Sequence, residues 1–251
     1  MFRIATYNIR YGGTGRLDLL LKVLISIEAD AILLTEASND EVLRQISSEM
    51  EMEYVKTEGT QSHLAFLSRV PILDWNSYCP KYINRALLEI RLAFSPHQEI
   101  AIYGLHLQCH YFSWNERQRL LELDTYLQYI KSRKPSSHLL LGDFNAVAPG
   151  DKFDRNRLPL KEKLMLGWER GRTYHDAIQK LHTESYVDCF RRLHPGEDGF
   201  TLPTGMPHVR LDYVFADPLL AASLKDCAVV TSPDETVDAS DHYPLAATFE
   251  L

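Results

Sequence analysis

The chain has 251 residues, of which 45% are hydrophobic and 24% are charged, and its formal net charge is −7. This length allows one large α/β domain or two small ones, and the ordinary composition excludes a low-complexity chain. The negative charge argues against a general high-affinity nucleic-acid binder, and no apolar run approaches the length that crosses a membrane.

Strand-like segments recur along the whole chain. Aliphatic, β-branched and aromatic residues fill them, and turn residues bound several. In residues 87–92, Leu87, Glu89 and Arg91 alternate with three apolar residues, the pattern of a half-buried strand. Residues 31–34 and 139–141 are instead continuously apolar, as in strands covered on both faces. The predicted strands are residues 2–8, 30–34, 52–56, 63–68, 71–78, 86–93, 99–105, 137–142, 210–216, 226–231 and 244–250.

Helical periodicity appears at residues 17–27, 39–49 and 114–132, and a fourth helix is predicted at 173–182. Early strand–helix units followed by tightly linked strands imply mixed sheets. The segment 149–172 is rich in Pro, Gly and charge, and it indicates a long surface excursion. No linker divides the chain, so we expect a single domain over residues 1–251.

The four cysteines lie far apart and form no metal-binding or redox spacing: Cys79, Cys109, Cys189 and Cys227. They indicate reduced thiols in a cytoplasmic protein. No basic-then-apolar leader precedes the first predicted strand, so no signal peptide is visible. We therefore expect a cytoplasmic monomer without a membrane anchor.

Six short blocks share one pattern, in which a strand-like apolar segment runs directly into polar or ionisable residues. The end of a strand places side chains at the rim of a sheet, where several strands can direct polar groups to one point. The blocks deliver three Asp, one Glu, two Asn and two His, an inventory that suits a hard divalent cation such as Mg²⁺ or Mn²⁺ and acid–base chemistry. They are residues 4–10, 32–36, 104–107, 139–145, 210–215 and 240–245.

Taken in chain order, these blocks resemble the endonuclease/exonuclease/phosphatase superfamily. The resemblance covers residues 4–245, and it includes the segment 64–72, which is similar to a central strand pair of that family. It implies a four-layer α/β/β/α sandwich, with two packed mixed sheets and helices on the outer faces. It also implies one or two divalent ions at one end of the sandwich and hydrolysis of phosphoester bonds.

The chemistry of a phosphodiester explains the residue types. A divalent cation neutralises the non-bridging oxygens and stabilises the pentavalent transition state. We expect Glu36 to be the main ligand, with help from Asn8 and Asp241.

The remaining polar residues are assigned to catalysis. Asp143 is placed to orient or deprotonate the attacking water, and Asn145 can hydrogen-bond a phosphoryl oxygen without adding charge. His242 contacts the scissile phosphate while Asp212 holds its ring in one tautomer. His106 supplies a second donor or the leaving-group acid.

Each of these residues also has a structural interpretation. Asn8 and Glu36 could cap a turn and a helix, and residues 143 and 145 could close a strand. Asp212 could form an ion pair with Arg210. Together these interpretations require six coincidences at strand ends, and we favour the catalytic assignment.

Two further groups are candidates for substrate binding. Arg85 resembles a phosphate-contacting arginine of deoxyribonuclease relatives, although a surface arginine is nearly as good an interpretation. Residues 152–172 carry seven basic and three acidic side chains, and we expect Arg155, Arg157 and Lys161 to contact phosphate. An ordinary solvated surface explains that stretch equally well.

Departures from family patterns narrow the choice of activity. Abasic-site repair members carry an acidic residue where this chain has Arg10, and tend to have Gln where it has Thr35. Base-excision repair is therefore disfavoured. Deoxyribonuclease relatives place a glutamate where this chain has residues 61–63, which leaves His106 without its expected partner.

Three functions follow from these observations. The first is a metal-dependent hydrolase of a phosphodiester in nucleic acid or a nucleotide, and the second is a lipid or inositol phosphoesterase. The third is a protein that has the fold but only binds. All eight site residues have the expected type, which favours an enzyme over the binding protein.

Overall fold

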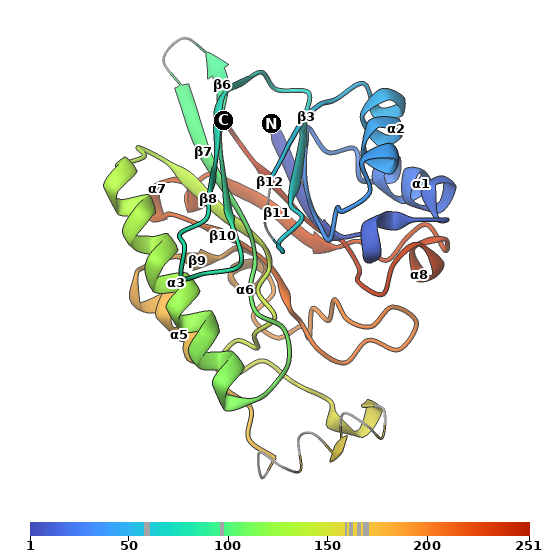
Figure 1. Cartoon of the computed structure of the whole chain (residues 1–251), viewed down its shortest axis with the longest axis vertical. Helices are drawn as coiled ribbons and strands as arrows, with labels where there is room; N and C mark the ends of the chain where they lie inside the picture. Colours follow the sequence, from blue (N-terminus) through green and yellow to red (C-terminus); the bar gives the residue numbers. More distant parts are fainter. Residues whose placement is uncertain (58–60, 96–97, 159, 161–162, 165–166, 168–170) are drawn as a thin grey trace.

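Two six-stranded mixed sheets pack face to face, and helices cover their outer faces (Figure 1). The computed structural model describes residues 1–57, 61–95, 98–158, 160, 163–164, 167 and 171–251. The predicted four-layer sandwich is confirmed. Within the described part of the chain, no helix is long and apolar enough to cross a membrane.

The first sheet combines strands from both ends of the chain. Its order is β11-β12-β1-β2-β4-β3, and β1 runs parallel to β2 because α1 (Leu17–Ile27) connects them as a crossover. The other neighbours are antiparallel. The strands are β1 (Phe2–Asn8), β2 (Ala31–Thr35), β3 (Glu53–Lys56), β4 (Ala65–Ser68), β11 (Leu224–Val229) and β12 (Leu245–Phe249).

The second sheet is built from the middle of the chain. Its order is β5-β6-β7-β8-β10-β9, and its parallel pair, β7 and β8, is joined by the long helix α3 (Ser113–Arg133). The other neighbours are antiparallel. The strands are β5 (Ile72–Tyr78), β6 (Leu87–Ser95), β7 (Gln98–His106), β8 (His138–Asp143), β9 (Val187–Asp188) and β10 (Asp212–Ala216).

The helices divide between the two outer faces. Figure 1 shows α1, α2 (Asp40–Met50) and α8 (Thr236–Ala239) on one side of the sandwich, and α3 with α5 (Asp176–Thr183) on the other. The shorter elements are α6 (Cys189–Leu193), α7 (Pro218–Ala221) and the 3-10 turns η1 (Tyr11–Gly13) and η2 (Arg155–Arg157).

Continuously apolar strands lie at the centre of the sandwich because both of their faces are covered. In β2, Ala31 and Leu33 pack between the sheets, whereas Ile32 and Leu34 pack under α1 and α2. The same division holds in β8, where Leu140 faces the α3 layer. The interpretation of residues 31–34 and 139–141 as central strands is therefore confirmed.

Strand register brings the polar ends of the blocks to one edge. Asn8 is paired with Thr35 across β1 and β2, His106 with Asp143 across β7 and β8, and Asp212 with Asp143 across β10 and β8. Gly142 makes this register possible. Its φ is +140°, and a Cβ added there would lie 1.9 Å from the carbonyl oxygen of Leu105, so only glycine fits.

The sequence placed the long elements within about three residues of where they lie, and it missed the short ones. Among the described residues, the missed elements are the two 3-10 turns and β9, α6, α7 and α8, which have 2, 5, 4 and 4 residues. Such lengths are too short to show a strand or helix period. Part of the predicted excursion at 149–172 lies outside the described residues.

Candidate active site

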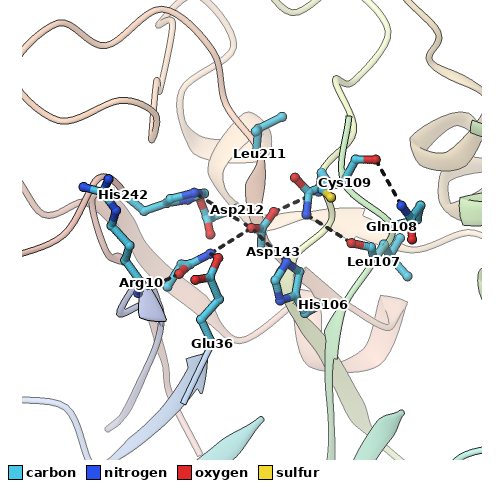
Figure 2. A network of polar contacts seen from close by, with 12 residues as sticks. Arg10, Glu36, His106, Leu107, Gln108, Cys109, Asp143, Leu211, Asp212 and His242 are labelled. Atoms are coloured by element: carbon cyan, nitrogen blue, oxygen red, sulfur yellow. Dashed lines mark hydrogen bonds and ion pairs between the residues drawn. The ribbon is translucent and has the colours of Figure 1, made fainter. Parts of the chain in front are cut away.

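A cavity of about 410 Å³ opens at the edge where the polar strand ends meet. Six residues assigned from the sequence line it, and Asn8 and Asp212 are hydrogen-bonded to residues of this lining. Figure 2 shows Asp212 beside His242 and Asp143. The lining residues are Tyr11, Glu36, Ser38, Gln61, Ser62, His63, Arg85, His106, Cys109, Asp143, Asn145 and His242.

Asn8 links the two sheets at the base of the cavity. Its amide nitrogen donates to Glu36 Oε1 and to Asp143 Oδ2, both at 3.1 Å, so both amide hydrogens are used. Its oxygen accepts from the backbone nitrogen of Arg10 at 3.0 Å. Asn8 is 1% exposed, and its two donated hydrogen bonds hold the buried Asp143 carboxylate and the half-buried Glu36 carboxylate in a fixed arrangement.

The turn at residues 10–13 fixes Glu36 from the other side. All four residues of the turn have positive φ, between 50° and 68°. The backbone nitrogen of Tyr11 donates to Glu36 Oε2 at 2.9 Å, and that of Gly12 donates to the Glu36 carbonyl at 2.7 Å. A Cβ at Gly12 would lie 2.7 Å from the backbone nitrogen of Asn39, so the turn requires glycine there.

Asp143 and Asn145 form a rigid polar pair after β8. The backbone nitrogen of Asn145 donates to Asp143 Oδ1 at 2.9 Å, and the Asn145 amide donates to the Leu107 carbonyl at 3.1 Å. Burial and the negative charge of Asp212 raise the pKa of the Asp143 carboxyl above its ordinary value. A carboxyl with a raised pKa is suited to exchange a proton with water.

His242 and Asp212 are a buried hydrogen-bonded pair. His242 Nδ1 lies 2.8 Å from Asp212 Oδ2, and His242 Nε2 lies 3.9 Å from Asp143 Oδ2. Burial alone would lower the pKa of His242, but the Asp212 charge and hydrogen bond raise it to about 10. The imidazole is therefore protonated at neutral pH and presents a positive charge to the cavity.

His106 lies on the opposite side of Asp143, with Nε2 at 3.6 Å from Asp143 Oδ2. Burial lowers the pKa of His106 to about 4, although the Asp143 charge acts in the other direction. Its Nδ1 is buried without a hydrogen-bond partner in the described structure. A neutral ring favours the role of hydrogen-bond donor over that of leaving-group acid.

The oxygen-rich side chains fit a hard cation. Asp143, Asp212 and His242 each offer a ligand atom, and these atoms lie within 4.8 Å of one another. Asp212 Oδ1 is buried without a hydrogen-bond partner among the described residues. Close carboxylates and an unsatisfied buried oxygen are the surroundings that a divalent cation stabilises.

Asp241, the third proposed metal ligand, forms an ion pair with Arg10. Its Oδ2 is 3.4 Å from Arg10 Nε, and Asp241 does not line the cavity. Figure 2 shows the Arg10 side chain extending toward His242. Asp241 thus pairs with Arg10, the residue that stands where abasic-site repair members carry an acidic side chain.

The predicted substrate-binding cations divide into two groups. Arg85 lines the cavity and donates to the His106 carbonyl at 3.0 Å. Arg155 donates to Thr173 at 2.6 Å and Arg157 contacts Asp154 at 3.2 Å, and neither lines the cavity. Lys161 lies outside the described residues.

The suggested ion pair between Arg210 and Asp212 is wrong. Arg210 is 0% exposed, and its guanidinium contacts Asp188 at 2.6 Å and Asp151 at 2.8 Å. Its charge is therefore satisfied from β9 and from the loop after β8. Asp212 therefore pairs with His242 and not with Arg210, and Asp188 has a structural role as the partner of the buried Arg210.

Sequence reasoning assigned Glu36 and Asn145 but missed Tyr11, His63 and Cys109, which also line the cavity. Ten described non-glycine residues have positive φ, and four of them line the cavity: Tyr11, Glu36, His63 and Asn145. Strained backbone often gathers at functional sites. The Gly12-Gly13 pair directly after the first strand was the available signal for the turn. No comparable signal in the sequence pointed to His63 or Cys109.

Comparisons with known proteins agree with this geometry. The sequence profile described as "Endonuclease/Exonuclease/phosphatase family" matches residues 5–242. No curated protein is significantly similar to the whole sequence.

Solved structures share the fold at low sequence identity. An AP endonuclease from Archaeoglobus fulgidus is 20% identical and has a TM-score of 0.78. The 3′ phosphatase NExo from Neisseria, bound to a product DNA hairpin, is 19% identical and has a TM-score of 0.77. In both comparisons the match covers 100% of each chain. A humanized D. rerio TDP2 is 19% identical with a TM-score of 0.70, over 100% of this chain and 99% of that one.

Proposed function

The chain belongs to the endonuclease/exonuclease/phosphatase family, and from this membership we propose that it is a divalent-metal-dependent hydrolase acting on a phosphodiester of a nucleic acid or nucleotide. The observation that carries the proposal is the convergence of Glu36, Asp143 and the His242–Asp212 pair on one cavity. A binding protein would have no need of this buried, electrostatically strained arrangement.

The buried carboxylates of Asp143 and Asp212 would add negative charge at the site, and Glu36 and Asn8 would hold the metal, Mg²⁺ or Mn²⁺. When bound, it neutralises the phosphoryl oxygens and increases the acidity of coordinated water. The Asn8 amide keeps Glu36 and Asp143 in fixed positions, so little reorganisation accompanies binding.

The other side chains act on the phosphodiester itself. Asp143 accepts a proton from the attacking water, because burial and the Asp212 charge raise the pKa of its carboxyl and make it a stronger base. His242, held protonated by Asp212, donates a hydrogen bond to a non-bridging oxygen and stabilises the negative charge that develops there. Arg85 and Asn145 contact the phosphoryl group from the cavity wall.

A nucleic-acid or nucleotide substrate is supported by the similar structures. Their names describe a 3′ phosphatase bound to DNA and an AP endonuclease. The alternative, a lipid or inositol phosphoesterase, is not favoured by these neighbours.

We also propose that residues 1–251 form one domain, because β1 from the first residues pairs with β12 from the last. The four free cysteines support a cytoplasmic location, and the protein is proposed to act as a monomer.

A turnover assay tests this proposal. Bis-para-nitrophenyl phosphate and para-nitrophenyl phosphate are compared with short DNA, RNA, nucleotides and inositol phosphates, each with Mg²⁺, with Mn²⁺ and with a chelator. We expect metal-dependent turnover of the diester and of at least one nucleic-acid substrate. Asp143→Asn is the inactive control, and Asp74→Asn on the exposed strand β5 is the matched control that retains activity. Turnover of the monoester or inositol phosphates alone would support the alternative, and no turnover at all would favour a binding protein.

A further inference from the structure

Tyr11 combines exposure with an unusually fixed position. It is 75% exposed, yet it lines the cavity beside Glu36. Its backbone nitrogen donates to Glu36 Oε2 at 2.9 Å, and its carbonyl accepts from the Thr14 hydroxyl at 3.3 Å. The backbone of Tyr11 therefore holds the proposed metal ligand, while its ring contributes little to the core.

The residue type at this position is not explained by folding. The backbone has a φ of +50°, a conformation that costs free energy for any residue with a Cβ and that glycine or asparagine adopts more readily. Exposed tyrosines are ordinary on protein surfaces, and Tyr82, 64% exposed outside the cavity, is an example. Tyr11 differs because a strained, hydrogen-bonded turn presents its ring at the cavity wall.

The ring also lies next to a cation. The guanidinium carbon of Arg10 is 5.6 Å from the centroid of the Tyr11 ring, within the range of a cation–π contact. Arg10 is restrained by Asp241 through its side chain and by Arg16 through its carbonyl oxygen. These contacts limit the positions open to the ring, and an aromatic surface that is already positioned loses little entropy when a ligand stacks on it.

We propose that Tyr11 is a specificity-determining residue whose ring stacks on the nucleobase next to the scissile phosphate. The inference rests on the proposed nucleic-acid or nucleotide substrate. A cavity of about 410 Å³ has the size of sites that hold small molecules, and the side chains proposed to bind phosphate line only part of it. Every base has a π-face, so this contact selects for the presence of a base over its identity.

The experiment compares two substrates that differ only in their bases. One is a single-stranded thymidine hexamer, and the other is the same backbone built from abasic tetrahydrofuran units. We expect Tyr11→Ala to lower kcat/KM on the thymidine hexamer about tenfold to a hundredfold, mainly through KM, and to leave the abasic chain unchanged. Tyr11→Phe keeps the ring and should resemble the wild type. Tyr82→Ala is the matched control and should change neither value.

The readouts separate stacking from other roles. Tyr11→Ala keeps the backbone nitrogen that binds Glu36, so the Mg²⁺ titration midpoint should match the wild type. An equal loss on both substrates, or no loss on either, would overturn the stacking role while leaving the hydrolase proposal in place. Failure of the wild-type protein to hydrolyse either substrate with metal would instead count against the nucleic-acid substrate itself.

Discussion

His242 Nδ1 and Asp212 Oδ2 are 2.8 Å apart in a buried pair, and this contact joins the loop before β12 to the first residue of β10. His242→Ala should lower kcat by several orders of magnitude. Asp212→Asn should lower it nearly as much, because an amide no longer favours the required tautomer and charge of the ring.

The double variant tests whether the two residues act as one unit. Combining His242→Ala with Asp212→Asn should cost far less than the product of the two single effects. The measurement is kcat for all four proteins at saturating metal. Multiplicative effects would show that Asp212 acts elsewhere, and a folded His242→Ala protein with near-normal turnover would exclude the site.

The raised pKa of His242 predicts a pH dependence of stability in the metal-free protein. The native ring holds its proton up to about pH 10, whereas the unfolded ring loses it near the ordinary value of 6.5. The contribution is therefore complete below about pH 6.5 and disappears as the pH rises through about 10. Between these values, the difference in unfolding free energy between wild type and His242→Gln should shrink by roughly 1.4 kcal/mol per pH unit.

Urea unfolding in the presence of a chelator, at several pH values, measures this difference. His106→Gln is the natural control because burial lowers the pKa of His106 to about 4. The native state resists protonation of that ring, so wild-type stability should fall relative to His106→Gln only as the pH drops from about 6.5 toward 4. A wild-type-to-His242→Gln difference that stays constant between pH 7 and 9 would contradict the assigned charge.

Glu36→Gln should weaken metal binding, and it should lower activity more at limiting than at saturating Mg²⁺. The physical reason is that a carboxylate attracts a hard cation and a neutral amide binds it poorly. The measurement is the Mg²⁺ concentration at half-maximal activity, with Glu41→Gln on the exposed start of α2 as the control. A wild-type midpoint with a reduced plateau would show that Glu36 is no ligand.

The basic segment of residues 152–172 should affect KM for the substrate more than kcat. Neutral replacements of Arg155, Arg157 and Lys161 are expected to raise KM on an oligonucleotide and to flatten its salt dependence. Because Arg155 and Arg157 already contact Thr173 and Asp154, part of their charge is engaged. An unchanged KM and salt slope would assign them to the solvated surface and favour a small substrate.

Gly142→Ala should disturb both folding and catalysis. The added methyl group would lie 1.9 Å from the Leu105 carbonyl oxygen, so β7 and β8 must separate. The expected loss is at least about 1–3 kcal/mol of unfolding free energy, together with reduced kcat because His106 and Asp143 move apart. Gly150→Ala is the control, since its φ is also positive but no atom lies within 4 Å. Equal effects of the two substitutions would mean that backbone conformation, and not crowding, decides the result.

Much of the site could be predicted because its residues follow recognisable strands. The apolar segments before Glu36 and Asp143 identified central strands, and strands that share an edge bring their last residues together. Contacts between distant side chains left no such trace in the sequence. The pairing of Arg210 with Asp188 and that of Arg10 with Asp241 depend on packing that no local pattern records.

Asn8 and Glu36 come from the first sheet, whereas Asp143, His106 and Asp212 come from the second, and the Asn8–Asp143 hydrogen bond spans the boundary. The candidate active site therefore lies at the interface of the two sheets, and its residues stay aligned only while the sheets keep their relative position. Close to this interface, a Cβ on Gly104 would lie 2.4 Å from a methyl group of Leu33, so the sheets are packed too tightly to slide past one another. Heating that loosens their contact would misalign the chemistry while each sheet still retained its own hydrogen-bonded strands.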